Sequence, residues 1–144
     1  MVGIRIADES TDKLVDAYKE LIPQLSTSSH PPTKKDLEQI IKSDSAMILV
    51  AENNDGEIVG TMTLVLFKIP TGVRAWIEDV VVDAGSRGEG IGKKLNRKAL
   101  DLAHEAGAKT VDLTSRPSRE SANRLYQDLG FKKRETNVYR FSFD

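Results

Sequence analysis

The stretch that decides the fold is Val80-Val-Val-Asp-Ala-Gly-Ser-Arg-Gly-Glu-Gly-Ile-Gly-Lys-Lys-Leu95. A β-branched apolar run stops at Asp83, and a glycine-rich loop follows it. Beyond the loop, apolar residues recur at helical spacing, at Ile91, Leu95, Ala99, Leu102 and Ala106. The stretch therefore predicts a strand, a tight loop and a helix, in that order.

Such a loop directs backbone N–H groups and the positive end of the helix dipole toward one place. Gly88, Gly90 and Gly92 add backbone freedom and let a ligand come close to the main chain. The sequence therefore predicts an anion site, most simply for phosphate. The alternative is an ordinary glycine-rich turn between a strand and a helix.

Two common phosphate-binding loops do not match this stretch. The ATP-type loop needs Gly-x4-Gly-Lys-Ser/Thr, but Arg87 stands at its first glycine and Lys94 at its Ser/Thr. The dinucleotide-binding fingerprint needs Gly-x-Gly-x-x-Gly, whereas the last two glycines here are separated by a single residue. The loop must therefore belong to another class.

Composition narrows the function further. The chain has 144 residues, of which 39% are hydrophobic and 30% charged, with a net charge of −1, so we expect a single domain over residues 1–144. The near-zero charge argues against general nucleic-acid or membrane binding. There is no cysteine, and His30 and His104 lie far apart, so no metal site is expected. No signal peptide or long apolar segment is seen, which favours the cytoplasm.

The rest of the chain predicts alternating blocks of strand and helix. Strands are expected at Ile4–Ile6, Met47–Ala51, Ile58–Phe67, Val73–Asp83, Thr110–Thr114, Phe131–Lys133 and Asn137–Phe143. A first helix is expected to be ended by Pro23 and the stretch Ser26–Pro32, a second to start at the Thr33 cap, a third to run from the loop to about Ala106, and a fourth to run from Ser118 to Gly130. The polar stretch Ser26–Pro32 is either a linker between helices or a flexible wall over a substrate cleft.

The expected order is βααβββαβαββ. It describes an α+β fold with α/β/α layers, in which a mostly antiparallel mixed sheet contains a central parallel βαβ unit around the loop.

A second motif follows the loop at Ala122-Asn-Arg-Leu-Tyr126-Gln-Asp-Leu-Gly130-Phe131. Together with the loop and the order of elements, it resembles the GNAT superfamily of N-acetyltransferases, which bind acetyl-coenzyme A. The resemblance implies the GNAT fold. The chain departs from the usual pattern at Arg119, where many members carry Asn three residues before the motif's first Ala.

The resemblance implies roles for named residues toward acetyl-coenzyme A. The strand end would lie beside pantetheine, through Val80, Val81 and Val82. The loop would hold the pyrophosphate, through Arg87, Gly88, Gly90, Ile91, Gly92 and Lys93. Arg119 or Asn123 would replace the usual Asn contact. Members of the superfamily transfer the acetyl group directly to an amine, without an acyl-enzyme.

Direct transfer needs an acid for the leaving thiolate and a base for the amine. Tyr126 matches the family's general acid, and its alternative role is a core tyrosine. Glu78 and Asp79 are the base candidates, because carboxylates are unexpected in an apolar strand. Neighbours on a strand face opposite ways, so only one can face a cleft unless a bulge intervenes, and Glu78 shares the parity of Val80 and Val82. We take Glu78 as the candidate catalytic base, and the alternative for each of the two is a hydrogen-bonded structural carboxylate.

The sequence therefore predicts an acetyl-coenzyme A-dependent N-acetyltransferase acting on a primary amine of a small molecule. The alternatives are a protein or peptide N-acetyltransferase and a catalytically silent acyl-coenzyme A-binding module. The β-prone segment Thr136–Phe143 is either the interface strand of a homodimer or part of the core.

Overall fold

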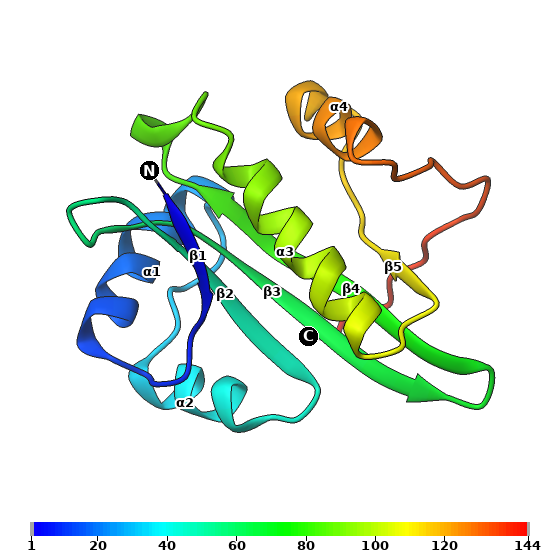
Figure 1. The fold of residues 1–144 in the computed structure, drawn as a ribbon, viewed down its shortest axis with the longest axis horizontal. Coiled ribbons are helices and arrows are strands. Elements are labelled where there is room, and N and C mark those ends of the chain that lie inside the picture. Colours follow the sequence, from blue (N-terminus) through cyan, green and yellow to red (C-terminus); the bar gives the residue numbers. More distant parts are fainter. Residues whose placement is uncertain (1, 144) are drawn as a thin grey trace. The chain divides into compact units, whose positions relative to one another are not determined.

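The computed structural model describes residues 2–143. The chain divides into two compact units, Met1–Thr114 and Ser115–Asp144, which are described separately. Within the described residues, the first unit contains five strands and three α-helices, and the second contains one α-helix (Figure 1).

The first unit is built on one sheet. Its strands are β1 Gly3–Ile6, β2 Ala46–Glu52, β3 Ile58–Ile69, β4 Gly72–Val82 and β5 Thr110–Asp112, in the spatial order β1-β2-β3-β4-β5. All neighbours are antiparallel except β4 and β5, which are parallel. The mixed sheet and its parallel βαβ unit are therefore confirmed. The unit lies at the edge of the described sheet and not at its centre, because no strand of the described chain pairs beyond β5.

Helices cover both faces of the sheet. Helices α1 Asp12–Leu25 and α2 Lys34–Lys42 lie on one face, and α3 Ile91–Glu105 lies on the other (Figure 1). The expected Thr33 cap is confirmed, because its hydroxyl accepts from the Asp36 amide while the Asp36 carboxylate accepts from the Thr33 amide. Pro23 does not end α1. The helix continues to Leu25, and the Ser26 amide closes its last turn on the Ile22 carbonyl.

The core lies on both faces of this sheet. Buried residues of α1, α2 and β2 pack on the first face and include Leu14, Tyr18, Ile22, Leu37, Ile48 and Val50. On the other face, Gly60 of β3 lets α3 approach closely. A Cβ at Gly60 would lie 3.2 Å from Ile91 Cγ2 and 3.3 Å from Leu95 Cδ1. The start of α3, and hence the loop before it, is thereby seated on the sheet.

A β-bulge interrupts β4 just before the loop. Thr61 pairs with Val81 and Thr63 pairs with Glu78, so two β4 residues, Asp79 and Val80, stand opposite a single β3 residue. Asp79 takes a left-handed conformation there, with φ of 52°. The extra residue shifts the alternation, so Glu78 shares its face with Val81. The parity with Val80 and Val82 expected from the sequence is therefore wrong.

The second unit contains α4 Glu120–Asp128. The N-cap of α4 is Arg119, one residue later than the expected Ser118, and it has no side-chain cap. The Tyr126 ring packs edge-to-face on Phe131, with centroids 5.8 Å apart.

The expected strands Phe131–Lys133 and Asn137–Phe143 do not form in the described part of this unit. A strand is stabilised by a paired neighbour and by burial of one face. Here Val138, Tyr139, Phe141 and Phe143 are 70–92% exposed, so neither condition is met.

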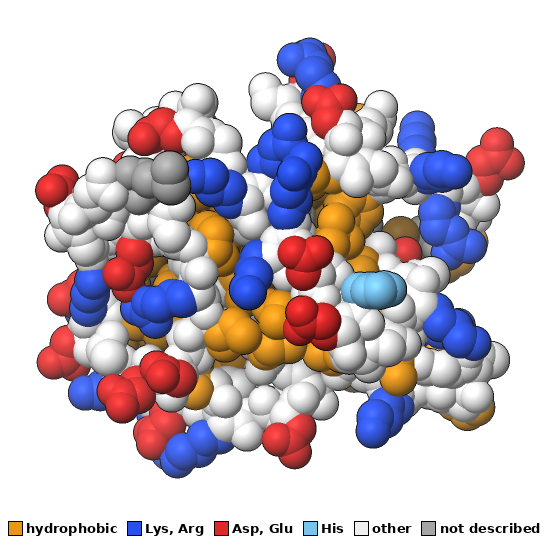
Figure 2. Space-filling model, viewed as in Figure 1, with side chains coloured by type: hydrophobic (Ala, Val, Ile, Leu, Met, Phe, Trp, Pro, Cys, Tyr) orange, Lys and Arg blue, Asp and Glu red, His pale blue; other side chains and the backbone are white. Residues whose placement is uncertain are grey.

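The surface in view carries both signs of charge. Figure 2 shows Lys and Arg side chains interspersed with Asp and Glu, without a large patch of one sign on that face. Within residues 2–143, no helix has the length and apolar character needed to span a bilayer.

Candidate active site

The glycine-rich loop begins with a hydrogen-bonded turn. Asp83 follows β4, and its side chain accepts from the Gly85 amide (3.1 Å), while its carbonyl accepts from Ser86 (2.9 Å). These bonds form a short 3-10 turn at Ala84–Ser86. The chain then passes through Gly88 and Gly90, with φ of 88° and 75°, and enters α3 at Ile91. The strand, loop and helix predicted from the sequence are confirmed.

The second half of the loop presents a run of free backbone donors. The amides of residues 87–93 make no well-formed hydrogen bond to an acceptor within residues 2–143. Gly90 is the N-cap of α3 and has no side chain to fill this place, and a Cβ at Gly88 or Gly90 would meet no atom within 4 Å. Free amides at a helix N-terminus attract anions, so the residues present fit a pyrophosphate group.

Two exposed cations flank these amides. Arg87 and Lys93 form no ion pair with any residue in the described range. Lys94 is directed elsewhere, since its Nζ donates to the Val2 carbonyl (3.5 Å).

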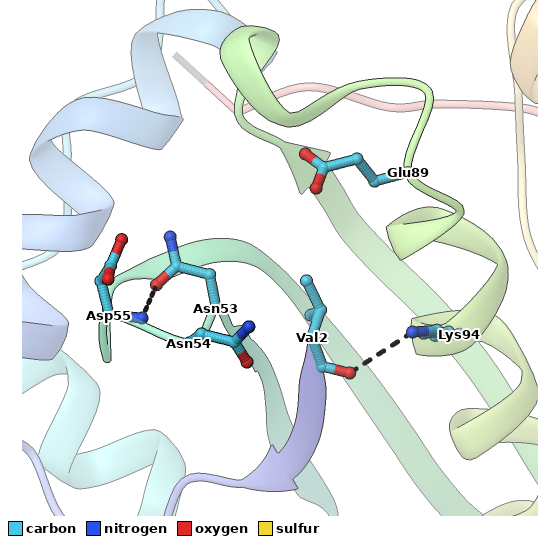
Figure 3. Close-up of a pocket in the computed structure, with 6 residues that line it drawn as sticks. All are labelled: Val2, Asn53, Asn54, Asp55, Glu89 and Lys94. Atoms are coloured by element: carbon cyan, nitrogen blue, oxygen red, sulfur yellow. Dashed lines mark hydrogen bonds between the residues drawn. The ribbon is translucent and has the colours of Figure 1, made fainter.

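A polar hollow of about 280 Å³ lies beside Lys94 and Val2 (Figure 3). It is lined by Val2, Asn53, Asn54, Asp55, Glu89 and Lys94. Lys94 therefore lines this hollow. The cations available to an anion bound by the loop amides are Arg87 and Lys93.

Strand β4 is open along part of one edge. Its pairing with β5 covers only Arg74–Trp76, opposite Thr110–Asp112. From Ile77 to Val82, this edge of β4 pairs with no strand of the described chain. Val81 is buried, while Val80 and Val82 are half-buried. An open edge of this length can accept backbone hydrogen bonding from an extended ligand with amide groups.

Two carboxylates lie at the bulge, and they differ in their contacts. The Trp76 indole N–H donates to Glu78 Oε1 (2.7 Å), which leaves the other oxygen of this exposed side chain free. Burial, and then the charge of Glu78, raise the pKa of Asp79.

Tyr18 and Thr61 lie near Asp79, and the sequence alone did not point to either of them as a site residue. Burial is the main cause that raises the pKa of Tyr18 to about 12; the Thr61 hydroxyl opposes the shift and Asp79 adds to it. The Thr61 hydroxyl is itself buried without a well-formed hydrogen bond. The sequence shows Tyr18 only as part of an apolar helix face, so no local signal marks it.

Asn96 is a second residue that the sequence analysis missed. It is fully buried one turn into α3, and its Nδ2 donates to the Gly92 carbonyl (2.8 Å). Its Oδ1 has no partner among the described atoms. A buried acceptor without a partner is costly, and the side chain has no exposed surface through which a ligand could reach it.

The second unit holds the other predicted site residues. Tyr126 is buried, and burial raises its pKa while the charge of Arg119 partly opposes the shift. Asn123 Nδ2 donates to the Arg116 carbonyl (3.0 Å), which fixes the turn before α4. The structure thus groups Glu78, the valines and the loop in one unit, and Tyr126, Arg119 and Asn123 in the other.

Residues 14–131 match the family model described as Acetyltransferase (GNAT) family. The chain belongs to this GNAT acetyltransferase family. It is therefore an acyltransferase, and enzymes of the family generally use acetyl-coenzyme A.

Several GNAT relatives are similar to the chain. An uncharacterized N-acetyltransferase, YhdJ of Bacillus subtilis, is 34% identical over 96 residues, covering 66% of this chain and 68% of that protein. The glucosamine 6-phosphate N-acetyltransferase of Trypanosoma brucei brucei is 39% identical over 86 residues, covering 58% of this chain and 56% of the relative. A mycothiol acetyltransferase of Beutenbergia cavernae is 32% identical over 87 residues, or 60% of this chain but 28% of the relative.

Solved GNAT structures share the fold along the whole chain. The glucosamine-6-phosphate N-acetyltransferase from Arabidopsis thaliana superposes with a TM-score of 0.83 at 27% identity, covering 100% of this chain and 99% of the other. The GNAT fold predicted from the order of elements is therefore confirmed, apart from the two last strands.

Proposed function

We propose that this GNAT enzyme transfers the acetyl group of acetyl-coenzyme A to a primary amine of a small molecule. The observation that carries the proposal is the run of free amides at residues 87–93, directly after the open edge of β4. The similarity to glucosamine 6-phosphate N-acetyltransferases supports a small-molecule acceptor.

In this proposal, the first unit binds the donor along its length. The amides of Gly88, Gly90, Ile91 and Gly92 hold the pyrophosphate, with charge added by Arg87 and Lys93. The exposed backbone of Val80, Val81 and Val82 receives pantetheine. Arg119 or Asn123 supplies a further contact, and Arg119 is the better candidate because the Asn123 amide already bonds the Arg116 carbonyl.

Acetyl-coenzyme A supplies an activated acyl group, and the protein supplies proton transfer. An alkylammonium has a pKa near roughly 10.4, so a base must remove its proton at neutral pH. The free oxygen of Glu78 accepts that proton, and the indole of Trp76 holds the carboxylate in place. The neutral amine then attacks the thioester carbonyl, the C–N bond forms and the C–S bond breaks. The Tyr126 hydroxyl, kept protonated by its raised pKa, donates its proton to the departing sulfur, and the second proton lost by the nitrogen returns to the tyrosinate oxygen.

Asp79 is the second candidate base. Its left-handed backbone conformation at the bulge and its raised pKa are features that occur at functional sites. Glu78 remains our first choice, because its geometry is fixed by a short hydrogen bond from a neighbour on the same face.

Calorimetry with acetyl-coenzyme A tests the proposal, and a matched pair of variants sharpens it. Gly90→Val should raise the dissociation constant at least about tenfold, because a β-branched residue is strained at φ of 75° and its methyl groups would enter the anion site. Gly107 has φ of 82° and is equally open, but lies at the far end of α3. Gly107→Val should therefore lower stability without weakening binding. An unmodified protein that fails to bind at millimolar concentration would overturn the proposal.

A screen of acceptors that follows thiol release separates the remaining functions. Turnover with small amines supports the proposal, whereas turnover only with peptide N-termini would assign the chain to the protein-modifying class. A protein that binds the donor and transfers to no amine would be an acyl-coenzyme A-binding module.

We also propose that both units belong to one N-acetyltransferase domain, since the family match spans residues of both.

The exposed aromatic side chains of Thr136–Phe143 support a homodimer that buries them. Light scattering should then show a dimer that Phe141→Ser weakens, and a monomer at high concentration would remove the idea.

A further inference from the structure

The side-chain amide of Gln24 connects the end of α1 to the first turn of the loop. Its Oε1 accepts from the Ala84 backbone amide (2.8 Å), and its Nε2 donates to Asp83 Oδ1 (2.9 Å) and to the Glu20 carbonyl (3.0 Å). All three partners agree on which atom is oxygen and which is nitrogen, because a flipped amide would place two acceptors, or two donors, face to face.

Gln24 bonds the loop at its first turn, Asp83–Ser86, just before the amides that lack a well-formed hydrogen bond. Asp83 is also held to the sheet, since its amide donates to the Val59 carbonyl (2.8 Å), and its carboxylate caps the turn at Gly85. The free amides begin immediately after this turn, at Arg87. The position of Ala84 and Asp83 therefore sets the direction in which the chain enters the anion site.

We propose that Gln24 is a positioning residue for the donor site: it holds the loop in its binding conformation before the donor arrives. The inference rests on the proposed function, because it takes the free amides as the site of the donor's pyrophosphate. An ordered loop loses less conformational freedom on binding, so the donor binds more tightly.

Gln24 also lies next to a segment that the sequence marks as a candidate wall of the acceptor cleft. Ser26 ends α1, and its hydroxyl accepts from the Ser28 amide (3.3 Å) and the Ser29 hydroxyl (3.1 Å). Gln24 therefore bonds the donor loop two residues before this segment begins, and its side chain makes no hydrogen bond to the described residues of the segment itself.

Gln24→Ala should raise the dissociation constant for acetyl-coenzyme A roughly 3- to 10-fold, the range expected for losing one or two exposed hydrogen bonds. The KM for the donor should rise while kcat at saturating donor stays unchanged, because Gln24 contacts only the loop. Gln39→Ala is the matched control, since Gln39 is an exposed glutamine on α2. A general loss of stability would instead lower kcat through the folded fraction.

A reciprocal exchange adds a sharper test. Gln24→Glu should weaken binding more than Gln24→Ala, because it places a second carboxylate beside Asp83. Adding Asp83→Asn to Gln24→Glu reverses the donor and acceptor between these two side chains and keeps the caps on Ala84 and Gly85. Because the substituted carboxylate still faces the Glu20 carbonyl, to which the Gln24 amide donated, affinity should return only in part. Partial recovery supports the positioning role, and equal affinities for Gln24→Ala and Gln39→Ala would overturn it.

Hydrogen exchange on the protein without ligand separates this inference from the proposed function. Gln24→Ala should speed exchange of the Ala84, Gly85 and Ser86 amides, and Gln39→Ala should not. Unchanged exchange would contradict the positioning role whether or not the donor binds. If Gln24→Ala speeds exchange but the unmodified protein never binds acetyl-coenzyme A, the ordering role of Gln24 is supported and the proposed function is overturned.

Discussion

Tyr126→Phe should lower turnover roughly 10²- to 10⁴-fold, the usual scale for general acid–base assistance. The change removes one hydroxyl and keeps the ring against Phe131, so the fold should survive. Affinity for the donor should change little, because the free amides of the loop are untouched. Steady-state kinetics, calorimetry and thermal melts measure these three quantities.

The second unit offers a matched control for this variant. Tyr139 is 89% exposed in the single chain, so Tyr139→Phe makes the same chemical change outside its core and keeps the ring that the proposed dimer would bury. Alkaline pH should not rescue Tyr126→Phe, since its defect lies at the leaving sulfur rather than at the amine. A rate equal to that of the unmodified enzyme would assign Tyr126 to the core alone.

Glu78→Gln should show the opposite pH behaviour. At neutral pH, turnover should fall by roughly 10²-fold or more, because the ammonium acceptor loses the group that takes its proton. As the pH approaches the amine's pKa of roughly 10.4, free amine forms without help and the rate should partly recover. The Trp76 indole can still donate to the carbonyl oxygen of the substituted side chain, so the position of that side chain is retained.

Asp79→Asn decides between the two carboxylates. If Glu78 is the base, Asp79→Asn should retain most activity and show no alkaline rescue. If the rescue appears in Asp79→Asn and not in Glu78→Gln, the roles are exchanged. Alkaline rescue of neither variant would leave both as structural carboxylates.

Local patterns in the sequence were enough to predict the loop and the helices. The glycines near Arg87 and the apolar spacing of α3 act within a few residues, and so does the Thr33 cap with Asp36. The bulge could not be predicted in the same way, because it depends on the register of β3 against β4. Plain alternation therefore placed Glu78 on the wrong face relative to Val80 and Val82.

Contacts across long sequence separations were also beyond local reasoning. Gln24 and Ala84 are 60 residues apart, and nothing near either residue marks the hydrogen bond between them. The last strands fail for a related reason. The alternating aromatics of residues 139–143 favour a strand locally, but strand formation requires a partner edge.

The open edge of β4 has a consequence for how the protein behaves in the absence of its donor. Exposed backbone donors and acceptors beside apolar side chains form a template on which another extended chain can add, the usual starting point of aggregation. A ligand that fills this edge also shifts the folding equilibrium toward the native state by mass action. The concentration of the donor would then affect the solubility of the enzyme as well as its rate. At low donor concentration, more of the protein would aggregate.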